Sequence, residues 1–112
     1  MSAPLLVLRN AACGLRVYRT SDRATALPRG MPHITIHEPR WVARGVVLSE
    51  EAAVEIAHAL LDGRDTQWGS LLSDRMLTLR HDSLGIHPLS FPLTKESREA
   101  IAATLFETVM QP

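Results

Sequence analysis

The sequence predicts an α+β protein in which two amphipathic helices cover one face of an antiparallel sheet. The phrase LSEEAAVEIAHALL at residues 48–61 returns as LTKESREAIAATLF at residues 93–106, with five of fourteen positions identical. Before each phrase, short stretches alternate between apolar and polar residues, as strands with one buried face do. A serine or threonine stands second in each phrase, where its hydroxyl can cap a helix.

Strand-like segments dominate the residues before the first phrase. Residues 5–8 form an apolar run of strand length, and residues 15–20 begin as a period-two alternation. Residues 21–32 are rich in turn formers and predict a long loop. The sequence HITIH at 33–37 alternates cleanly, and residues 42–48 return as a fourth strand after a hairpin connection.

The first helix is predicted to begin after Ser49. Glu50 and Glu51 follow, where the helix dipole favours negative charge. Its apolar stripe at helical spacing consists of Ala53, Ile56, Ala57 and Leu60. Gly63 supplies the C-terminal stop, because glycine readily takes the left-handed conformation found there.

The second half follows the same pattern. A short strand is expected near residues 68–72, and Leu77-Thr78-Leu79 is paired with Ile34-Thr35-Ile36 as its counterpart. Residues 81–85 are interpreted as a turn, and residues 89–93 as a strand that two prolines confine to an edge. The second helix begins after Thr94, and its stripe consists of Ile101, Leu105 and Val109.

These elements predict the order ββββα-(β)ββα within a single domain, residues 1–112. An internal repeat is expected over residues 33–62 and 76–109. Neither helix can bury its stripe alone, so both are expected on the same face of one shared sheet. The other face of that sheet would then be uncovered.

The composition is that of a globular protein, with 46% hydrophobic and 21% charged residues. The single Cys13 excludes an intrachain disulfide and fits a reducing compartment. No apolar run approaches the roughly 20 residues that span a bilayer. We therefore expect a cytoplasmic protein with no membrane association and no signal peptide.

The net charge is zero, but the two halves of the chain differ. Residues 1–48 carry seven arginines against two acidic residues, and residues 49–112 carry five basic against ten acidic residues. Such asymmetry is typical of a surface that binds polyanions. It equally fits two halves that attract each other within or between subunits, and we expect a homodimer.

No catalytic, cofactor-binding or metal-binding residue is predicted. The adjacent His81-Asp82-Ser83 contains the residue types of a triad, but neighbouring turn positions cannot place a base between nucleophile and orienting acid. His33 and His37 share a strand face, yet about 13 Å of strand separates them, too far to ligate one ion. The six glycines are dispersed and form no phosphate-binding loop.

The uncovered sheet face is the candidate binding surface. Side chains that point away from the helices include Thr35 and Thr78, and a hairpin end adds a tryptophan between arginines. The candidate residues are Arg16, Tyr18, His33, His37, Arg40, Trp41, Arg44 and Arg80. Arginines with a few rings on a sheet are typical of single-stranded nucleic-acid binding, because cations neutralise phosphates and rings stack on bases. A solvated face, or one covered by a second subunit, is the alternative.

The strands that lead into GVVLSEEAAVEIAHALL resemble the strand-rich unit, closed by a capped helix, of the transcriptional coactivators related to positive cofactor 4. A duplicated unit resembles the Whirly single-stranded-DNA-binding fold. This resemblance implies DNA binding on the sheet. The first hypothesis is a small non-enzymatic module that binds a macromolecule of unknown identity as a homodimer. The alternatives are a single-stranded nucleic-acid binder and an enzyme with an unrecognised site.

Overall fold

Two four-stranded antiparallel sheets and two helices form the part of the chain that the structure describes. The computed structural model describes residues 3–10, 13–20, 30–38 and 43–110. Sheet A contains β1 (Leu6–Arg9), β2 (Gly14–Arg19), β3 (Pro32–His37) and β4 (Ala43–Val47). Sheet B contains β5 (Thr66–Gly69), β6 (Met76–Arg80), β7 (Ser83–Ile86) and β8 (Leu89–Pro92). Helix α1 spans Glu50–Asp62, and helix α2 spans Lys95–Met110.

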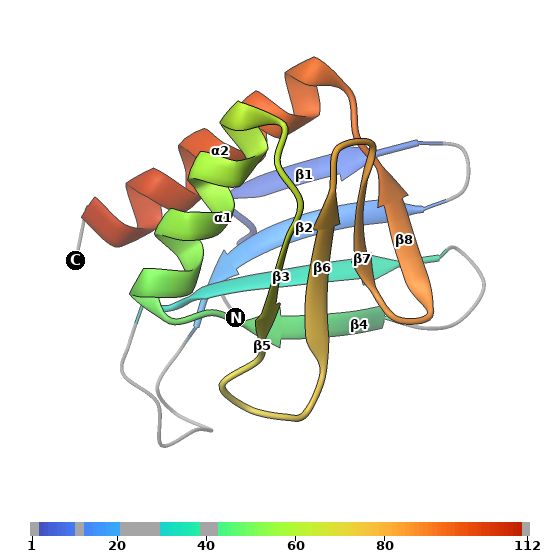
Figure 1. Cartoon of the computed structure of the whole chain (residues 1–112). Helices are drawn as coiled ribbons and strands as arrows, with labels where there is room; N and C mark the ends of the chain where they lie inside the picture. Colours follow the sequence, from blue (N-terminus) through green and yellow to red (C-terminus); the bar gives the residue numbers. More distant parts are fainter. Residues whose placement is uncertain (1–2, 11–12, 21–29, 39–42, 111–112) are drawn as a thin grey trace.

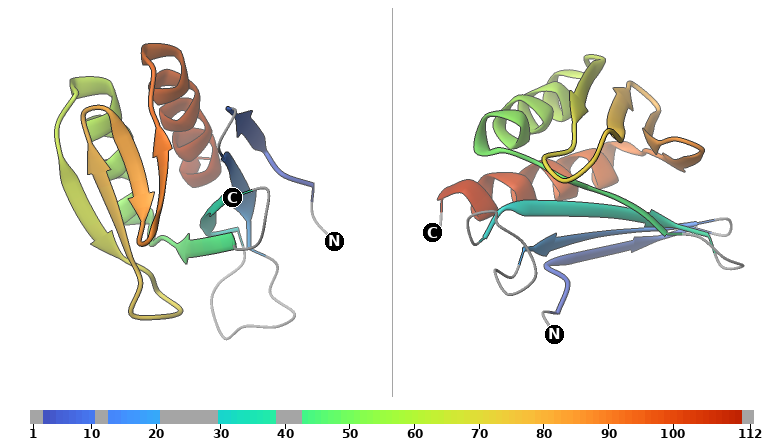
Figure 2. Two further views of the ribbon diagram at one scale, coloured as in Figure 1. Left: turned by 90° about the vertical axis from the view of Figure 1, so that its right-hand side faces the viewer. Right: turned by 90° about the horizontal axis from the view of Figure 1, so that it is seen from below.

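The strands of the two sheets run across each other, with α1 and α2 side by side next to them (Figure 1). Seen from below, both helices and sheet B lie on the same side of sheet A (Figure 2, right). None of the described helices or strands covers the opposite face of sheet A (Figure 2).

Each helix packs against the sheet of the other half of the chain. Helix α2 contacts β1, β2 and β3, whereas α1 contacts β5 and β6. The sheets also touch directly, β3 against β8 and β4 against β7. The buried residues consequently form one hydrophobic cluster with members from both halves, including Leu15, Ile34, Leu60, Leu84 and Leu105.

The predicted helix boundaries are confirmed, and their caps explain them. The Ser49 hydroxyl accepts a hydrogen bond from the Ala52 amide at 3.1 Å. Gly63 ends α1 in the left-handed conformation, with φ 73°. At the start of α2, the Thr94 hydroxyl accepts from the Ser97 amide, and the Ser97 hydroxyl accepts from the Thr94 amide. This reciprocal pair satisfies amides that a helix start otherwise leaves without partners.

Arg98 joins the two helices to sheet B. Its Nε donates to the Leu60 carbonyl at 2.8 Å, and its Nη2 donates to the Ala59 carbonyl at 3.4 Å. Its Nη1 donates to the carbonyl of His81 in the turn between β6 and β7. A side chain of α2 thus satisfies the last carbonyls of α1, which has no basic residue in its own last turn.

The α+β class and the repeat of a group of strands followed by a helix are confirmed, but the second half contains four strands where two or three were predicted. The stripe residues Ile56, Leu60, Ile101 and Leu105 are each at most 1% exposed. The strands, however, divide between two sheets and do not share one. With two separate sheets, α1 can pack on sheet B and α2 on sheet A. Both apolar stripes are then buried, and the two halves of the chain remain in contact.

The turn predicted at residues 81–85 is shorter than expected and occupies only His81 and Asp82. Strand β7 begins at Ser83, and Leu84 and Ile86 are fully buried. The turn formers Asp82, Ser83 and Gly85 concealed this alternation in the sequence. By order in each half, β7 takes the place of β3 and β6 that of β2, so Leu77-Thr78-Leu79 is not the counterpart of Ile34-Thr35-Ile36.

Candidate binding face on sheet A

The outer face of sheet A carries a row of polar and ring-bearing side chains. In the strand register Arg16 lies opposite Thr35, and Tyr18 lies opposite His33. The intervening Leu15, Val17, Ile34 and Ile36 are fully buried on the other face. The period-two alternation of β2 and β3 therefore places this row on the face that no described helix or strand covers (Figure 2).

Two glycines make room for the histidine rings. A Cβ atom on Gly14 would lie 2.6 Å from His37 Cε1, and one on Gly45 would lie 2.7 Å from His33 Nε2. Each ring therefore lies over the backbone of a glycine in the neighbouring strand. Side chains at these two positions would displace the rings. The glycines therefore allow both histidine rings to lie against the sheet instead of projecting from it.

Arg16, Tyr18 and His33 form a connected group at the centre of the face. The Tyr18 and His33 ring centroids are 6.0 Å apart, within the range of aromatic contact. Arg16 Nη1 donates to the Tyr18 hydroxyl at 3.4 Å, a long hydrogen bond. Arg16 Nε is buried and has no hydrogen-bond partner among the described residues. Because Nε is shielded from solvent, only the terminal nitrogens of the guanidinium can contact a ligand.

At its described strand positions, the outer face of sheet A carries positive and neutral groups only. These positions, read from the register, are Val7, Arg9, Gly14, Arg16, Tyr18, His33, Thr35, His37, Ala43 and Gly45, together with Val47, which has the same alternation but is only 2% exposed. None of these described positions holds a carboxylate, so no acidic group on them repels a phosphate.

Arg9 belongs to the same face and was missed in the sequence. It ends β1 directly opposite Gly14. The apolar run at residues 5–8 concealed the alternation in which Leu6 and Leu8 face the core and Val7 and Arg9 face outward. Reading Arg9 as part of that strand would have identified it.

Two of the remaining candidate residues, Arg44 and Arg80, are not part of this row. Arg80 lies on the outer face of sheet B, opposite Ser83, so the predicted surface is divided between two sheets. Arg44 lies opposite the buried Ile36, so it alternates with the inner and not the outer face of sheet A. Its Nη1 donates to the Ala43 carbonyl. Arg40 and Trp41 lie outside the described residues.

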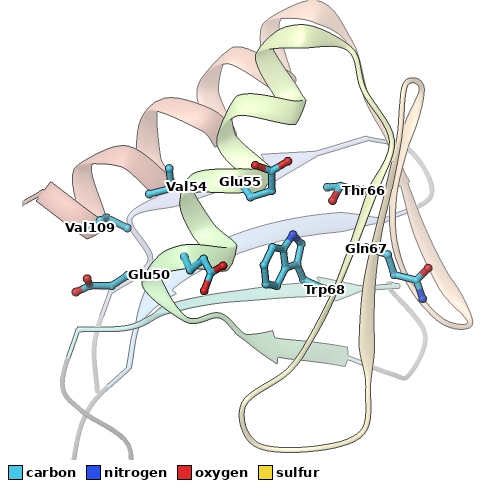
Figure 3. A pocket seen from close by; sticks show the side chains of 8 residues that line it. Glu50, Val54, Glu55, Thr66, Gln67, Trp68 and Val109 are labelled. Carbon is cyan, nitrogen blue, oxygen red and sulfur yellow. The ribbon is translucent and has the colours of Figure 1, made fainter.

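A groove of different character lies on the other side of the molecule. Residues of α1 and β5, together with Val109 of α2, line a hollow of about 590 Å³. Figure 3 shows Trp68 between α1 and β5, with Glu50 and Glu55 on the side of the helix. Carboxylates make this groove negative, so it is not suited to phosphate.

The described residues contain no candidate metal site, and their one thiol is buried. Among them, no three His, Cys, Asp or Glu side chains are placed to hold a metal ion. Cys13 is buried, and burial raises the pKa of its thiol. Its Sγ donates to the Ser90 carbonyl at 3.4 Å, a contact between the two sheets. No helix in the described part of the chain is long and apolar enough to cross a membrane.

Comparisons of the chain with models of protein families, with curated proteins and with solved structures gave no match.

Burial lowers the pKa of His33 below its ordinary value of 6.5. Between the lowered pKa and 6.5, the unfolded chain binds the proton more readily than the folded chain does. The free energy of unfolding should therefore fall as the pH drops through this window. In urea denaturation at about pH 7 and pH 5, we expect His33→Gln to lose less stability than the parent. An equal loss in both proteins would contradict a half-buried, neutral His33.

Proposed function

We propose that this protein is a non-enzymatic module that binds single-stranded nucleic acid on the outer face of sheet A. One observation carries the proposal. The uncovered face joins two arginines, Arg9 and Arg16, to a tyrosine and two histidine rings, without an acidic strand residue among them. Arginines supply the charge that phosphates require, and rings supply surfaces on which bases stack.

Single strands suit this face better than duplexes do. The histidine rings lie over Gly14 and Gly45, so the face is low, and a ligand can approach the rings across the strands. Unpaired bases can stack on such rings, whereas the bases of a duplex already stack on one another. The terminal nitrogens of the Arg16 guanidinium, and not its buried Nε, are the donors that can contact a phosphate oxygen.

Arg16→Ala and Tyr18→Ala should affect binding in different ways. Loss of the Tyr18 ring removes a stacking surface and should cost about 1–3 kcal/mol of affinity at every salt concentration. Loss of Arg16 removes one phosphate contact, so the slope of log K against log salt should become shallower by about 0.7. Fluorescence anisotropy with a labelled single-stranded oligonucleotide, repeated over a range of salt concentrations, measures both effects.

Arg64→Ala is the matched control, because it removes the same charge at the far end of α1, where Arg64 pairs with Glu55 and Asp62. It should leave the salt slope unchanged. Undetectable binding of a long oligonucleotide at low salt would eliminate nucleic acid as the ligand. The open face would then belong to a module for another macromolecule.

We also propose that the protein works as a homodimer in the cytoplasm. The connection between β5 and β6 presents Leu71 and Leu72, which are 43% and 51% exposed. Backbone and hydroxyl hydrogen bonds hold this connection against Val47. The free thiol of Cys13 suits a reducing compartment such as the cytoplasm.

Light scattering at micromolar concentration tests self-association. We expect twice the mass of the chain, and we expect Leu72→Glu to reduce that mass to one copy, because the added charge opposes burial of this apolar surface. Leu61→Glu, at an equally exposed leucine of α1, is the control and should remain a dimer. A monomer mass for the parent at low and moderate salt would eliminate the dimer.

A further inference from the structure

A second hollow lies on the outer face of sheet B, where the side chains alternate with the buried leucines of β6 and β7. Gly85 lies at its centre, and Thr78 of β6 and Ser90 of β8 are its direct partners in the neighbouring strands. Arg80 and Ser83 form the adjacent pair. With His87, which follows β7, these residues line a volume of about 210 Å³.

The lining of this hollow consists largely of hydrogen-bond donors. Thr78, Ser83 and Ser90 carry hydroxyl groups, Arg80 adds a guanidinium, and no carboxylate lines the hollow. Within the described residues, no hydrogen bond or ion pair holds the side chain of Arg80 or His87. A guanidinium and several hydroxyls can therefore turn toward one small ligand that bears only acceptor atoms.

We propose that this hollow binds a phosphate group. A tetrahedral oxyanion presents acceptors in several directions, and arginine binds it through paired, charge-assisted hydrogen bonds. The volume is below the range of about 300–1,000 Å³ that is typical of pockets for larger organic ligands, so it suits a small group. The site does not rest on the function proposed for sheet A.

The two outer faces differ in what they can recognise. The described strand positions on the outer face of sheet B are Gln67, Gly69, Met76, Thr78, Arg80, Ser83, Gly85, Ser90 and Pro92. None of them carries an aromatic ring, so this face offers no strand residue on which a base can stack. Its strand positions are suited to an anionic group, whether a free phosphate or one within a polymer.

Asp65 is placed to oppose this site. It lines the adjoining hollow together with Arg80, although no ion pair joins the two side chains. Its negative charge lowers the attraction of this edge of sheet B for anions. Removal of that charge should therefore strengthen phosphate binding.

Amide chemical shifts, measured during titration with sodium phosphate against sodium chloride at equal ionic strength, test the site. We expect saturable shifts at Ser83, Gly85 and His87 with phosphate only. Arg80→Gln should weaken the apparent affinity about tenfold or more. Asp65→Asn should strengthen it, and Arg75→Gln, with the same charge change outside the hollow, should leave it unchanged.

Gly85→Ala provides a test that does not alter charge. A Cβ atom there would lie 3.4 Å from the Leu89 carbonyl oxygen, an ordinary contact, so the fold should be retained. The methyl group would occupy the floor of the hollow, and the saturable shifts at Ser83 and His87 should disappear. Arg16→Ala should leave these shifts in place, because sheet A is not involved.

A second titration with a short thymidine oligonucleotide identifies the source of the phosphate. If the oligonucleotide moves the same amides and competes with inorganic phosphate, the site binds the backbone of a polymer. If only inorganic phosphate moves them, the site binds a free anion. Shifts that do not saturate, or that are equal in Arg80→Gln and Arg75→Gln, would overturn the proposal.

Discussion

Truncation of Leu105 to alanine is expected to lower the free energy of unfolding by about 2–5 kcal/mol. Leu105 is fully buried on α2, the helix that packs against α1 and against three strands of sheet A. A cavity at this position would remove apolar contacts that close packing otherwise provides. Guanidinium or urea denaturation, followed by circular dichroism, measures the change.

Leu61→Ala is the matched control for that variant. It makes the same substitution in a helix, but Leu61 is 54% exposed. Its cost should stay within about 0.5 kcal/mol, as is usual for surface positions. Because one core joins both halves, Leu105→Ala should also keep a single unfolding transition. A Leu105→Ala protein as stable as the parent would reject the shared core.

Replacement of Arg98 by methionine is expected to cost about 1.5–3 kcal/mol, the usual range for hydrogen bonds to a charged group. The methionine keeps much of the apolar stem but removes the guanidinium, which donates to the carbonyls of Ala59, Leu60 and His81. Two of these carbonyls end α1, where a positive charge also interacts favourably with the helix dipole. Denaturation by urea measures the loss.

Arg64→Met is the control for the helix end. Arg64 lies just beyond the same end of α1, but its partners Glu55 and Asp62 are on the exposed surface. Ion pairs at exposed positions contribute little, so this variant should be clearly more stable than Arg98→Met. If Arg98→Met and Arg64→Met unfolded at the same urea concentration, water would satisfy the α1 carbonyls as well as Arg98 does.

The outer row on β2 and β3 could be predicted from the sequence, because alternation in a strand directly states which residues share a face. Arg16, Tyr18, His33 and His37 were placed correctly on this basis. The contacts within the row could not be predicted. That His33 lies over Gly45, and His37 over Gly14, depends on the register between strands, which no single strand encodes.

The assignment of Arg80 to the same surface failed for a related reason. Its alternation within β6 was correct, since Leu77 and Leu79 are buried and Thr78 and Arg80 face outward. Nothing in that alternation states to which sheet the strand belongs. The structure places β6 in sheet B, where Arg80 contributes to a different hollow.

By itself the sequence determined the local elements: Ser49 and Thr94 begin the helices, Gly63 ends the first, and the spacing of apolar residues selects the buried faces. These features depend on interactions within a few residues, so they can be read from the chain. Only the tertiary structure decided that α1 packs on sheet B, that α2 packs on sheet A, and that Arg98 closes the end of α1. An apolar stripe specifies that it must be covered but not by which partner, because the hydrophobic effect has no direction. Which sheet each helix covers is decided by the arrangement that buries the apolar faces of both sheets and both helices at the same time.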